Sequence, residues 1–315
     1  MEPRIEPVAI SQQVVPGLVS ILIVNWNDLK YLEGCLRSIR EKIAWPHEVI
    51  LLDNGSADDS AAFVEREFPE VRLVRSDVNL GFIRATNLAS KHAGGEFFLL
   101  LNPDTILQTD IASGVRLLQA DGSIGAVGAK ALGGDGLPRS NCGHYPSALR
   151  LALIRSVFWN PYRGSYGPKE FGAKKVDWVE GSWLLTPSSA WKMAGGLDER
   201  LFLYGDDVHY CRRLKELGLI SVQMPTLLYI HFGGFAHRRQ AYLYAGFRWF
   251  HAKFSGRVHR RTAEIVMKLG LRSRVAVFSL LALILRNPKY ADRRRSTQRV
   301  LDVWDQMEQP RARFE

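Results

Sequence analysis

Cysteine is scarce in this sequence, and no apolar run is long enough to cross a membrane. The 315 residues contain three cysteines, Cys35, Cys142 and Cys211, which lie far apart and form no CxxC pair. This spacing argues against a disulfide framework and a zinc knuckle, and it favours a reducing compartment. The longest apolar run, residues 275–285, is well short of the roughly 20 residues that span a bilayer. It predicts either a buried helix or a helix lying in a membrane interface.

Common targeting and nucleotide-binding motifs are also missing. The N-terminal segment MEPRIEPVAISQQVVPG carries charges and prolines where a signal peptide needs an apolar core. No GxGxxG follows the first apolar run and no GxxxxGK(S/T) occurs, which argues against dinucleotide binding and a P-loop. There is no GxSxG and no HExxH. Acidic side chains are the remaining candidates for chemistry.

Positive charge is what the sequence has in excess. Lys and Arg number 42 against 32 Asp and Glu, which gives a formal net charge of +10. Such an excess favours anionic partners, such as nucleotides, phospholipid headgroups or nucleic acid. Because no nucleic-acid-binding motif accompanies the charge, we predict no nucleic-acid partner.

Short β-branched runs alternate with longer segments of helical spacing in the first third of the chain. Near-continuous apolar strands that alternate with helices predict a mostly parallel α/β sheet covered on both faces. Ligands of such sheets bind beyond the carboxyl ends of the strands. The predicted strands are residues 19–24, 48–53, 71–75 and 97–101, with crossover helices within 29–40, 56–68 and 82–93.

The residues that follow these strands are unusually polar. Asn25 and Asn27 follow the first strand, Asp53 ends the second, DVNLGF follows the third, and NPDT follows the fourth. Turn chemistry is the alternative interpretation, because turns and helix caps prefer Asn, Asp and Gly. Four such ends at one edge favour a binding site.

Asp104, in NPDT, is the acid best placed to hold a metal ion. Hard divalent cations prefer carboxylate oxygens, and one protein carboxylate can be enough when a diphosphate supplies further ligands. A bound Mg²⁺ or Mn²⁺ would stabilise the charge that develops on a leaving nucleoside diphosphate.

Several spaced segments resemble family 2 glycosyltransferases, particularly the bacterial rhamnosyltransferase-like branch. These segments are VSILIVNWN, VILLDNGSADDS, NLGFIRATNLA, FFLLLNPDTIL, EGSWLL, GGLDERLFLYGDDVHYCRRLKELG and HFGG, in this order between residues 19 and 234. The resemblance implies a GT-A fold and inverting transfer of a sugar from a nucleotide donor to an acceptor hydroxyl.

The resemblance also implies roles for individual residues. Asp53 would hydrogen-bond the pyrimidine base. Asp104 matches the last acid of the family's metal-binding DxD motif, whose first acid is replaced by Asn102 here. His231, in HFGG, matches a histidine near the metal or diphosphate, although a lone histidine beside apolar residues is more often a hydrogen-bonded core residue. We predict that the donor is bound by Asn25, Asn27, Asp53, Asn79, Gly81, Arg84, Asn87, Asn102 and Asp104.

The adjacent acids Asp206 and Asp207 match the family's ED motif, whose second acid is the catalytic base. If a helix begins near Gly205, consecutive residues point about 100° apart. Asp207 then lies on an apolar, inward stripe with Cys211, Leu214 and Gly218. Asp206 lies on the same side as His209 and Arg213, and this side can be solvated or paired. An inward carboxylate is the better base, because desolvation raises its pKa. The alternative is that either acid only caps the helix.

The acceptor side is predicted to include Gly181, Trp183 and Asp206. Trp183 could stack on a sugar face, with core packing as the alternative. Downstream, basic residues interleave with aromatic ones and have two interpretations: attachment to an anionic membrane surface, or a solvated face on packing helices. These residues are Arg248, Trp249, Phe250, Lys253, Phe254, Arg257, Arg260 and Arg261.

We therefore predict a metal-assisted inverting glycosyltransferase that moves rhamnose from dTDP-rhamnose to a cell-surface glycan or lipid-linked acceptor. The expected location is the cytoplasm, peripheral on the inner face of the cytoplasmic membrane. The predicted domains are an N-terminal extension (1–17), a GT-A domain (18–236) and a basic helical C-terminal extension (237–315). Within the GT-A domain, residues 18–130 form the nucleotide-binding half and residues 131–236 the acceptor-binding half.

Two other functions remain alternatives. A nucleotidyltransferase would share the nucleotide-binding half but needs a basic pyrophosphate-binding loop after the first strand, where NWNDLK is a poor match. A catalytically silent nucleotide-sugar or membrane-binding module is disfavoured by the intact Asp104 and Asp207. The sequence does not predict an oligomeric state.

Overall fold

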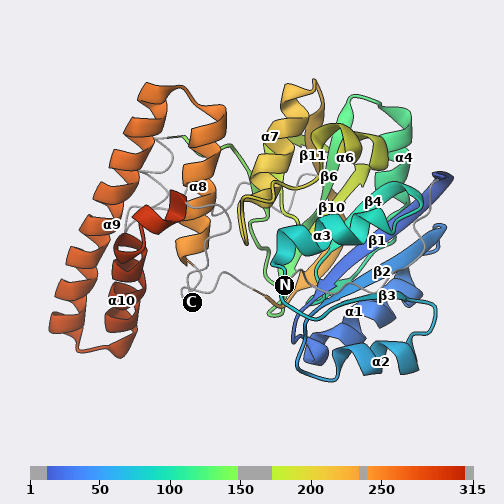
Figure 1. Ribbon diagram of the computed structural model, residues 1–315, viewed down its shortest axis with the longest axis horizontal. Coiled ribbons are helices and arrows are strands. Elements are labelled where there is room, and N and C mark those ends of the chain that lie inside the picture. Colours follow the sequence, from blue (N-terminus) through green and yellow to red (C-terminus); the bar gives the residue numbers. More distant parts are fainter. Residues whose placement is uncertain (1–12, 148–171, 234–239, 309–315) are drawn as a thin grey trace. The chain divides into compact units, whose positions relative to one another are not determined.

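A computed structural model describes residues 13–147, 172–233 and 240–308 (Figure 1). The chain divides into two compact units. The first comprises Met1–His144, Pro168–Asp198 and Asp206–Gly233, and the second comprises Tyr145–Gly167, Glu199–Gly205 and Gly234–Glu315. The division near residue 233 lies close to the domain boundary predicted at 236. Among the described residues, the second unit also takes up residues 145–147 and 199–205, which sequence periodicity did not indicate.

The nucleotide-binding half of the first unit has the predicted parallel sheet. Strands β1 (Val15–Asn25), β2 (His47–Asn54), β3 (Arg72–Ser76) and β4 (Gly95–Leu101) run parallel in the order β3-β2-β1-β4. Three helices connect them: α1 (Leu29–Lys42), α2 (Ser60–Glu67) and α3 (Phe82–Lys91). All four strands and three helices are confirmed, and β1 begins within the predicted N-terminal extension.

The other half of the sheet is mixed, because it contains both parallel and antiparallel pairs of strands. Strand β10 (Trp183–Pro187) is antiparallel to both β4 and β6 (Ile124–Gly133). Strand β11 (Ile220–His231) lies parallel to β6 and antiparallel to β5 (Thr105–Leu107) and β8 (Lys174–Val176). Strands β7 (Cys142–Gly143) and β9 (Trp178–Val179) form a separate pair. Helices α4 (Ala112–Ala120), α6 (Ser188–Ala194) and α7 (Asp206–Glu216) complete this unit's described helices.

Apolar periodicity explains how the sheet is covered. Helix α1 buries Leu32, Cys35, Leu36 and Ile39, one stripe at spacings of three and four residues. These side chains pack in one cluster with alternate residues of the strands, including Ile21 and Leu99. Burying a Leu or Ile side chain fully contributes about 1.5–3 kcal/mol. The cluster therefore fixes the strands whose polar ends are of interest.

The second unit is helical, as predicted for the C-terminal extension. It contains α8 (Gln240–Phe254), α9 (Arg257–Leu285), α10 (Pro288–Asp302) and the 3₁₀ helix η2 (Asp305–Glu308), and α9 and α10 lie side by side (Figure 1). Its own core includes Tyr244, Met267, Leu271, Val300 and Trp304. Among the described residues, no helix is long and apolar enough to cross a membrane.

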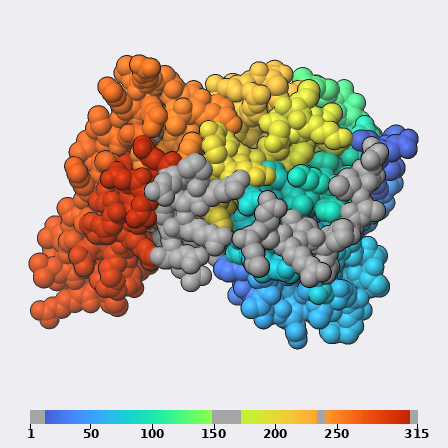
Figure 2. All heavy atoms as spheres, in the orientation of Figure 1, coloured from blue at the N-terminus to red at the C-terminus, as the bar shows by residue number. Residues whose placement is uncertain are grey.

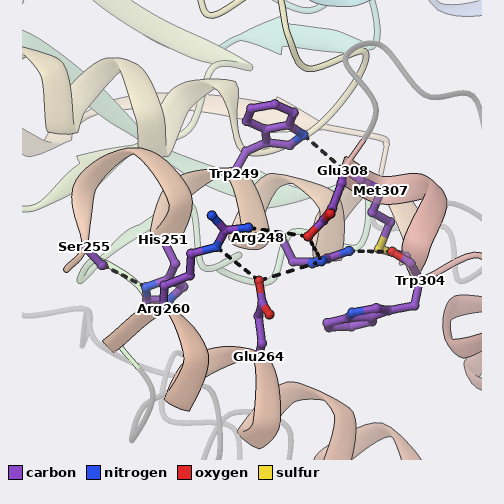
Figure 3. Close-up of polar contacts among 9 residues, drawn as sticks. All are labelled: Arg248, Trp249, His251, Ser255, Arg260, Glu264, Trp304, Met307 and Glu308. Atoms are coloured by element: carbon purple, nitrogen blue, oxygen red, sulfur yellow. Dashed lines mark hydrogen bonds and ion pairs between the residues drawn. The ribbon is translucent and has the colours of Figure 1, made fainter. Parts of the chain in front are cut away.

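Part of the predicted membrane-binding cluster is internal to this unit. Arg248 is only 6% exposed, and its Nη1 donates to the Trp304 carbonyl at 2.5 Å, while its Nη2 pairs with Glu308 at 2.5 Å (Figure 3). Phe250 is buried as well. Arg260 pairs with Glu264 at 3.3 Å. For Arg248 and Phe250 both interpretations, a lipid-binding surface and a solvated face, are therefore wrong, since both side chains are buried in packing.

Candidate active site

The predicted site residues gather at the carboxyl edge of the sheet because the strands are in register there. Asn25, at the end of β1, pairs with Asp53 of β2. Leu101, at the end of β4, pairs with Trp183 of β10, and the Asn102 amide donates to the Ser182 carbonyl at 3.1 Å. At the far side, His231 of β11 pairs with Thr105 of β5.

A preorganised polar cluster joins the ends of β1 and β2. Asn25 Nδ2 donates to Asp53 Oδ1 and to Ser56 Oγ, each at 3.1 Å, and both Asn25 and Asp53 are buried. Asn27 has a positive φ of 57° and its Oδ1 accepts from the Ala57 amide at 2.7 Å. The cluster locks the DNGS turn to the first strand. The same residues thus fit both the turn interpretation and the binding-site interpretation.

The loop after β3 is shaped by Asn79 and Gly81. Asn79 Oδ1 accepts from the Gly81 amide at 2.8 Å and from Asn54 Nδ2 at 3.1 Å. Gly81 has φ +81°, a left-handed conformation that glycine adopts without strain. The loop therefore enters α3 in a fixed direction, and Arg84 lies partly buried on the first turn of that helix.

Asn87, predicted to line the nucleotide, is engaged elsewhere. Its Nδ2 donates to the Leu197 carbonyl and its Oδ1 accepts from the Leu197 amide, both at 2.9 Å. A Cβ on Gly196 would lie 2.6 Å from Asn87 Oδ1, so the backbone approaches this amide closely. The side chain thus holds the 195–198 segment against α3, a positioning role that the sequence did not indicate.

Asp104 and His231 form the candidate metal-binding pair. Asp104 Oδ1 lies 3.3 Å from His231 Nε2, and their side chains are 17% and 13% exposed. Burial alone would lower the pKa of His231, but the hydrogen bond to Asp104 and the charges of Glu180 and Asp104 outweigh it and raise that pKa. The histidine is hydrogen-bonded, as the core interpretation requires, but its partner is the candidate metal ligand.

Gly233 leaves room beside this pair. A Cβ on Gly233 would overlap Asp104 Oδ2 and would lie 3.0 Å from His231 Nε2. Among the described residues, no group of three or more His, Cys, Asp or Glu side chains could hold a metal ion. An oxygen and a nitrogen donor at adjacent positions fit a Mg²⁺ or Mn²⁺ ion whose remaining ligands come from a diphosphate and water.

Glu180 is a carboxylate of this site that the sequence analysis missed. Its Oε1 lies 3.9 Å from His231 Nδ1, and its side chain is 33% exposed. Burial raises the pKa of Glu180 to about 7; the charge of His231 opposes this rise, and those of Asp207 and Asp104 add to it. The residue thus connects the metal-binding pair electrostatically with the acidic pair. Its position at the start of EGSWLL, three residues before β10, was the signal that could have identified it.

Helix α7 begins at Asp206, after Gly205 with φ +85°. Asp207 Oδ1 accepts from the Val208 amide at 2.7 Å, and its Oδ2 accepts from the Gly181 amide at 3.4 Å. Burial raises the pKa of Asp207 to about 6, against the lowering effect of these amide donors. A carboxylate with this pKa can accept a proton near neutral pH.

The predicted helical phase of α7 is only partly correct. Cys211 and Leu214 are buried as expected, but Gly218 lies beyond the helix and is exposed. Asp206 is 6% exposed and is therefore not solvated, whereas Asp207 is partly exposed, so the acid predicted to point inward is the less buried of the two. Burial, and then the charge of Asp207, raise the pKa of Asp206 well above its ordinary value. His209 on the same side is buried too, with its Nδ1 3.9 Å from Asp198 Oδ2.

The acceptor-side predictions have different outcomes. Trp183 is 2% exposed and belongs to the hydrophobic core, so the prediction that it stacks on a sugar is wrong. Gly181 lies at the acidic pair, where a Cβ would be 3.6 Å from Asp206 Oδ2 and 3.8 Å from Asp207 Cβ. Its acceptor-binding role remains a prediction.

Comparison with known proteins identifies similar sequences and folds. The model of the family described as Glycosyl transferase family 2 matches residues 20–160. The chain is 30% identical over 234 residues to an N-acetylglucosaminyl-diphospho-decaprenol L-rhamnosyltransferase of Mycobacterium tuberculosis, covering 68% of this chain and 76% of that protein.

Two solved structures share the fold at low sequence identity. The mannosyltransferase PcManGT from Pyrobaculum calidifontis, in complex with GDP-Man and Mn²⁺, has a TM-score of 0.56 at 16% identity over 91% of this chain and 87% of that one. Residues 1–349 of S. aureus TarS in complex with UDP have a TM-score of 0.52 at 16% identity over 90% and 80%. The predicted GT-A fold is thus confirmed.

Proposed function

This chain belongs to glycosyl transferase family 2 and is a glycosyltransferase, and we propose that it transfers rhamnose from dTDP-rhamnose, with inversion, to a hydroxyl group of a lipid-linked saccharide. The observation that carries the proposal is the arrangement at the sheet edge. A candidate base, Asp207, accepts from the Gly181 amide at 3.4 Å, and the adjacent residue, Glu180, lies 3.9 Å from His231 of the candidate metal-binding pair. The 30% identity to the mycobacterial L-rhamnosyltransferase supports the choice of sugar.

In the proposed reaction Asp207 removes the proton of the acceptor hydroxyl as that oxygen attacks the anomeric carbon. The bond between the anomeric carbon and the diphosphate oxygen breaks, and dTDP leaves. One base is sufficient, because the leaving group needs stabilisation of charge more than a proton. Asp104 and His231 would hold Mg²⁺ or Mn²⁺, which supplies that stabilisation when bound. The Mn²⁺ in the structurally similar mannosyltransferase supports the use of a divalent metal ion.

The donor base is proposed to bind at the β1–β2 cluster. Asp53 can accept a hydrogen bond from N3–H of thymine, and its own orientation is fixed by Asn25. Because the cluster is already formed, little side-chain entropy is lost on binding. Asn27, Asn79, Gly81, Arg84 and Asn102 lie on the segments that follow the same strand ends and remain proposed donor contacts.

The acceptor and the location are proposed together. The name of the mycobacterial relative specifies an N-acetylglucosaminyl-diphospho-decaprenol acceptor, which supports a polyprenyl-linked saccharide here. Such an acceptor resides in a membrane, so we place the reaction at the inner face of the cytoplasmic membrane.

A donor panel tests the proposal. dTDP-rhamnose, UDP-N-acetylglucosamine and GDP-mannose are compared for thermal stabilisation with Mn²⁺ or Mg²⁺ and for transfer to a polyprenyl-diphosphate-linked N-acetylglucosamine. We expect dTDP-rhamnose to stabilise most and to yield dTDP. Preference for another donor would overturn the sugar assignment. Release of pyrophosphate would indicate a nucleotidyltransferase, and stabilisation without turnover would indicate a binding module.

A further inference from the structure

The end of the α9–α10 hairpin is apolar and unburied. Residues 275–285, VAVFSLLALIL, form the last eleven residues of α9. Four large side chains in this run are more than half exposed: Leu280 (56%), Leu283 (76%), Ile284 (63%) and Leu285 (54%). The interpretation of this run as a buried helix is therefore wrong. Figure 2 shows atoms of α9 and α10, orange to red, on the visible face of their unit.

The exposure is continuous and has a sharp boundary. Helix α9 packs through Ala263, Met267 and Leu271, which recur every four residues. From residue 272 to residue 296, all of them described, no residue is buried. Burial resumes at Thr297 and Val300 of α10. The hairpin thus has a base whose side chains are buried within its unit and an apolar end where the two helices contact each other, as Phe278 and Tyr290 do, but bury no residue completely.

Positive charges surround this apolar end. Exposed basic side chains precede and follow it, namely Arg272, Arg286, Lys289 and Arg294. Arg293 lies over the Phe278 ring, with its guanidinium carbon 6.0 Å from the ring centroid. Asp292 is the single acid between residues 272 and 296, and it pairs with Arg295. An apolar surface bordered by cations is complementary to a bilayer with anionic headgroups.

We propose that this end of the hairpin, residues 272–296, inserts into the headgroup region of an anionic lipid surface. The eleven-residue run is about 16 Å long at helical rise, which is about half the hydrocarbon thickness of a bilayer. Such a helix lies in the interface, where apolar side chains reach roughly 5–10 Å below the headgroups. A second copy of the chain is a poorer partner, because a symmetric contact would bring the same cations together. The proposal rests on exposure and charge alone and does not depend on the donor or the reaction.

Vesicle flotation of the full chain tests this surface. Phosphatidylcholine vesicles with and without phosphatidylglycerol are compared at low and high salt. We expect binding only with phosphatidylglycerol, and weaker binding at high salt. The triple variant Leu280→Ser, Leu283→Ser, Ile284→Ser should bind at least tenfold less. Its control, Leu137→Ser with Met193→Ser, changes side chains that are 62% and 55% exposed outside the hairpin and should bind like wild type.

Charge reversal gives a second, independent test. Arg286→Glu, Lys289→Glu, Arg294→Glu should lose binding, since each basic residue contributes roughly fivefold. The control Lys42→Glu, Lys91→Glu, Lys192→Glu reverses as many exposed charges elsewhere and should keep most of it. Equal loss of vesicle binding in both variants would mean that binding depends on net charge alone, and it would overturn the assigned surface.

A site-specific label reports insertion directly. The cysteines 35, 142 and 211 are all buried, so a thiol-reactive, polarity-sensitive dye can be directed to Leu283→Cys or to the control Leu137→Cys. We expect a blue shift on anionic vesicles for position 283 only. No shift at 283, or self-association that the Leu280/Leu283/Ile284 variant abolishes in light scattering, would overturn the lipid assignment.

Discussion

At the scale of single residues, Asp207 is the group whose protonation should control turnover. Its pKa is raised to about 6 by burial, and a base must be ionised to accept a proton. We therefore predict that kcat/KM falls about tenfold per pH unit below that pKa and that Asp207→Asn lowers kcat about 10²–10⁴-fold. Steady-state rates between pH 5 and 8, with dTDP affinity measured in parallel, check both expectations.

The exposed acid Asp135 supplies the matched control for this substitution. It forms a surface ion pair with Arg139, and Asp135→Asn should leave the pH profile unchanged. A profile of the wild type that is flat from pH 5 to 7, or near-normal turnover by Asp207→Asn, would exclude Asp207 as the base.

Two glycines offer a steric test of the metal-binding pair. A Cβ on Gly233 would overlap Asp104 Oδ2, whereas a Cβ on Gly181 would make only ordinary contacts with the acidic pair. We predict that Gly233→Ala displaces the Asp104 carboxylate. At least tenfold more Mn²⁺ should then be needed for half of the maximal thermal stabilisation by dTDP. Thermal shift across an Mn²⁺ titration measures this effect. Gly181→Ala, the control, should need the same Mn²⁺ concentration as wild type. If Gly181→Ala raised the Mn²⁺ requirement and Gly233→Ala did not, Asp104 would be excluded as the metal ligand.

At the scale of elements, Asn87 joins helix α3 to the segment before α7. Asn87→Ala removes both partners of the Leu197 main chain, and a buried amide left unsatisfied costs about 1–3 kcal/mol. We expect the melting temperature to fall by several degrees, at roughly 2–4 °C per kcal/mol for a domain of this size. Calorimetry together with dTDP titration distinguishes this role from donor binding.

The comparison for Asn87 is Asn79→Ala, which perturbs the loop at the start of α3. Asn79 remains a proposed donor contact, so its loss should weaken dTDP binding more than Asn87→Ala does. An unchanged melting temperature with a large loss of dTDP affinity in Asn87→Ala would support the donor-binding role predicted for Asn87 instead.

Elements with strong local periodicity were predictable from the sequence, and elements defined by distant partners were not. Strands β1 and β2 follow from β-branched runs bounded by turn residues. The antiparallel insertion of β10 does not, because pairing of Trp183 with Leu101 is decided by tertiary contacts. The same limit explains Trp183 itself, whose sequence pattern fits both a sugar platform and a core residue.

The candidate site shows the same division between local and distant signals. Asp53, Asp104, His231 and Asp207 were identified from motifs and register, and the structure brings each to the same sheet edge. Glu180 was missed because its importance comes from neighbours on other elements. Burial of Arg248 was missed because its partners, Trp304 and Glu308, lie more than fifty residues further along the chain.

At the scale of the whole molecule, the buried acids should make stability depend on pH. Burial, followed by the charge of Asp207, raises the pKa of Asp206 in the folded state. The folded protein then holds this proton more tightly than the unfolded chain, whose Asp has a pKa of about 3.9. The folded state is therefore favoured below that value and loses this advantage as the pH rises through the folded-state pKa.

Asp206→Asn removes this pH-dependent loss. We predict that the melting temperature of the variant, relative to wild type, rises between pH 4.5 and pH 8. Differential scanning fluorimetry over this range measures the difference. Asp302→Asn, which changes an exposed acid of α10, should show a constant difference. A variant that is less stable than wild type at pH 8 would mean that the Asp206 carboxylate is stabilising when ionised.

The position of β11 sets an order for the folding of the site. This strand lies between β6 and β5, and one of its bonds joins Leu228 to Thr109, 119 residues earlier in the chain. Closing so long a loop is slow compared with forming the β1–β2 cluster from neighbouring segments. During synthesis, the nucleotide-binding half can therefore fold before His231 is available to pair with Asp104. A nascent chain would form its β1–β2 cluster first and its candidate metal-binding pair only after β11 has left the ribosome.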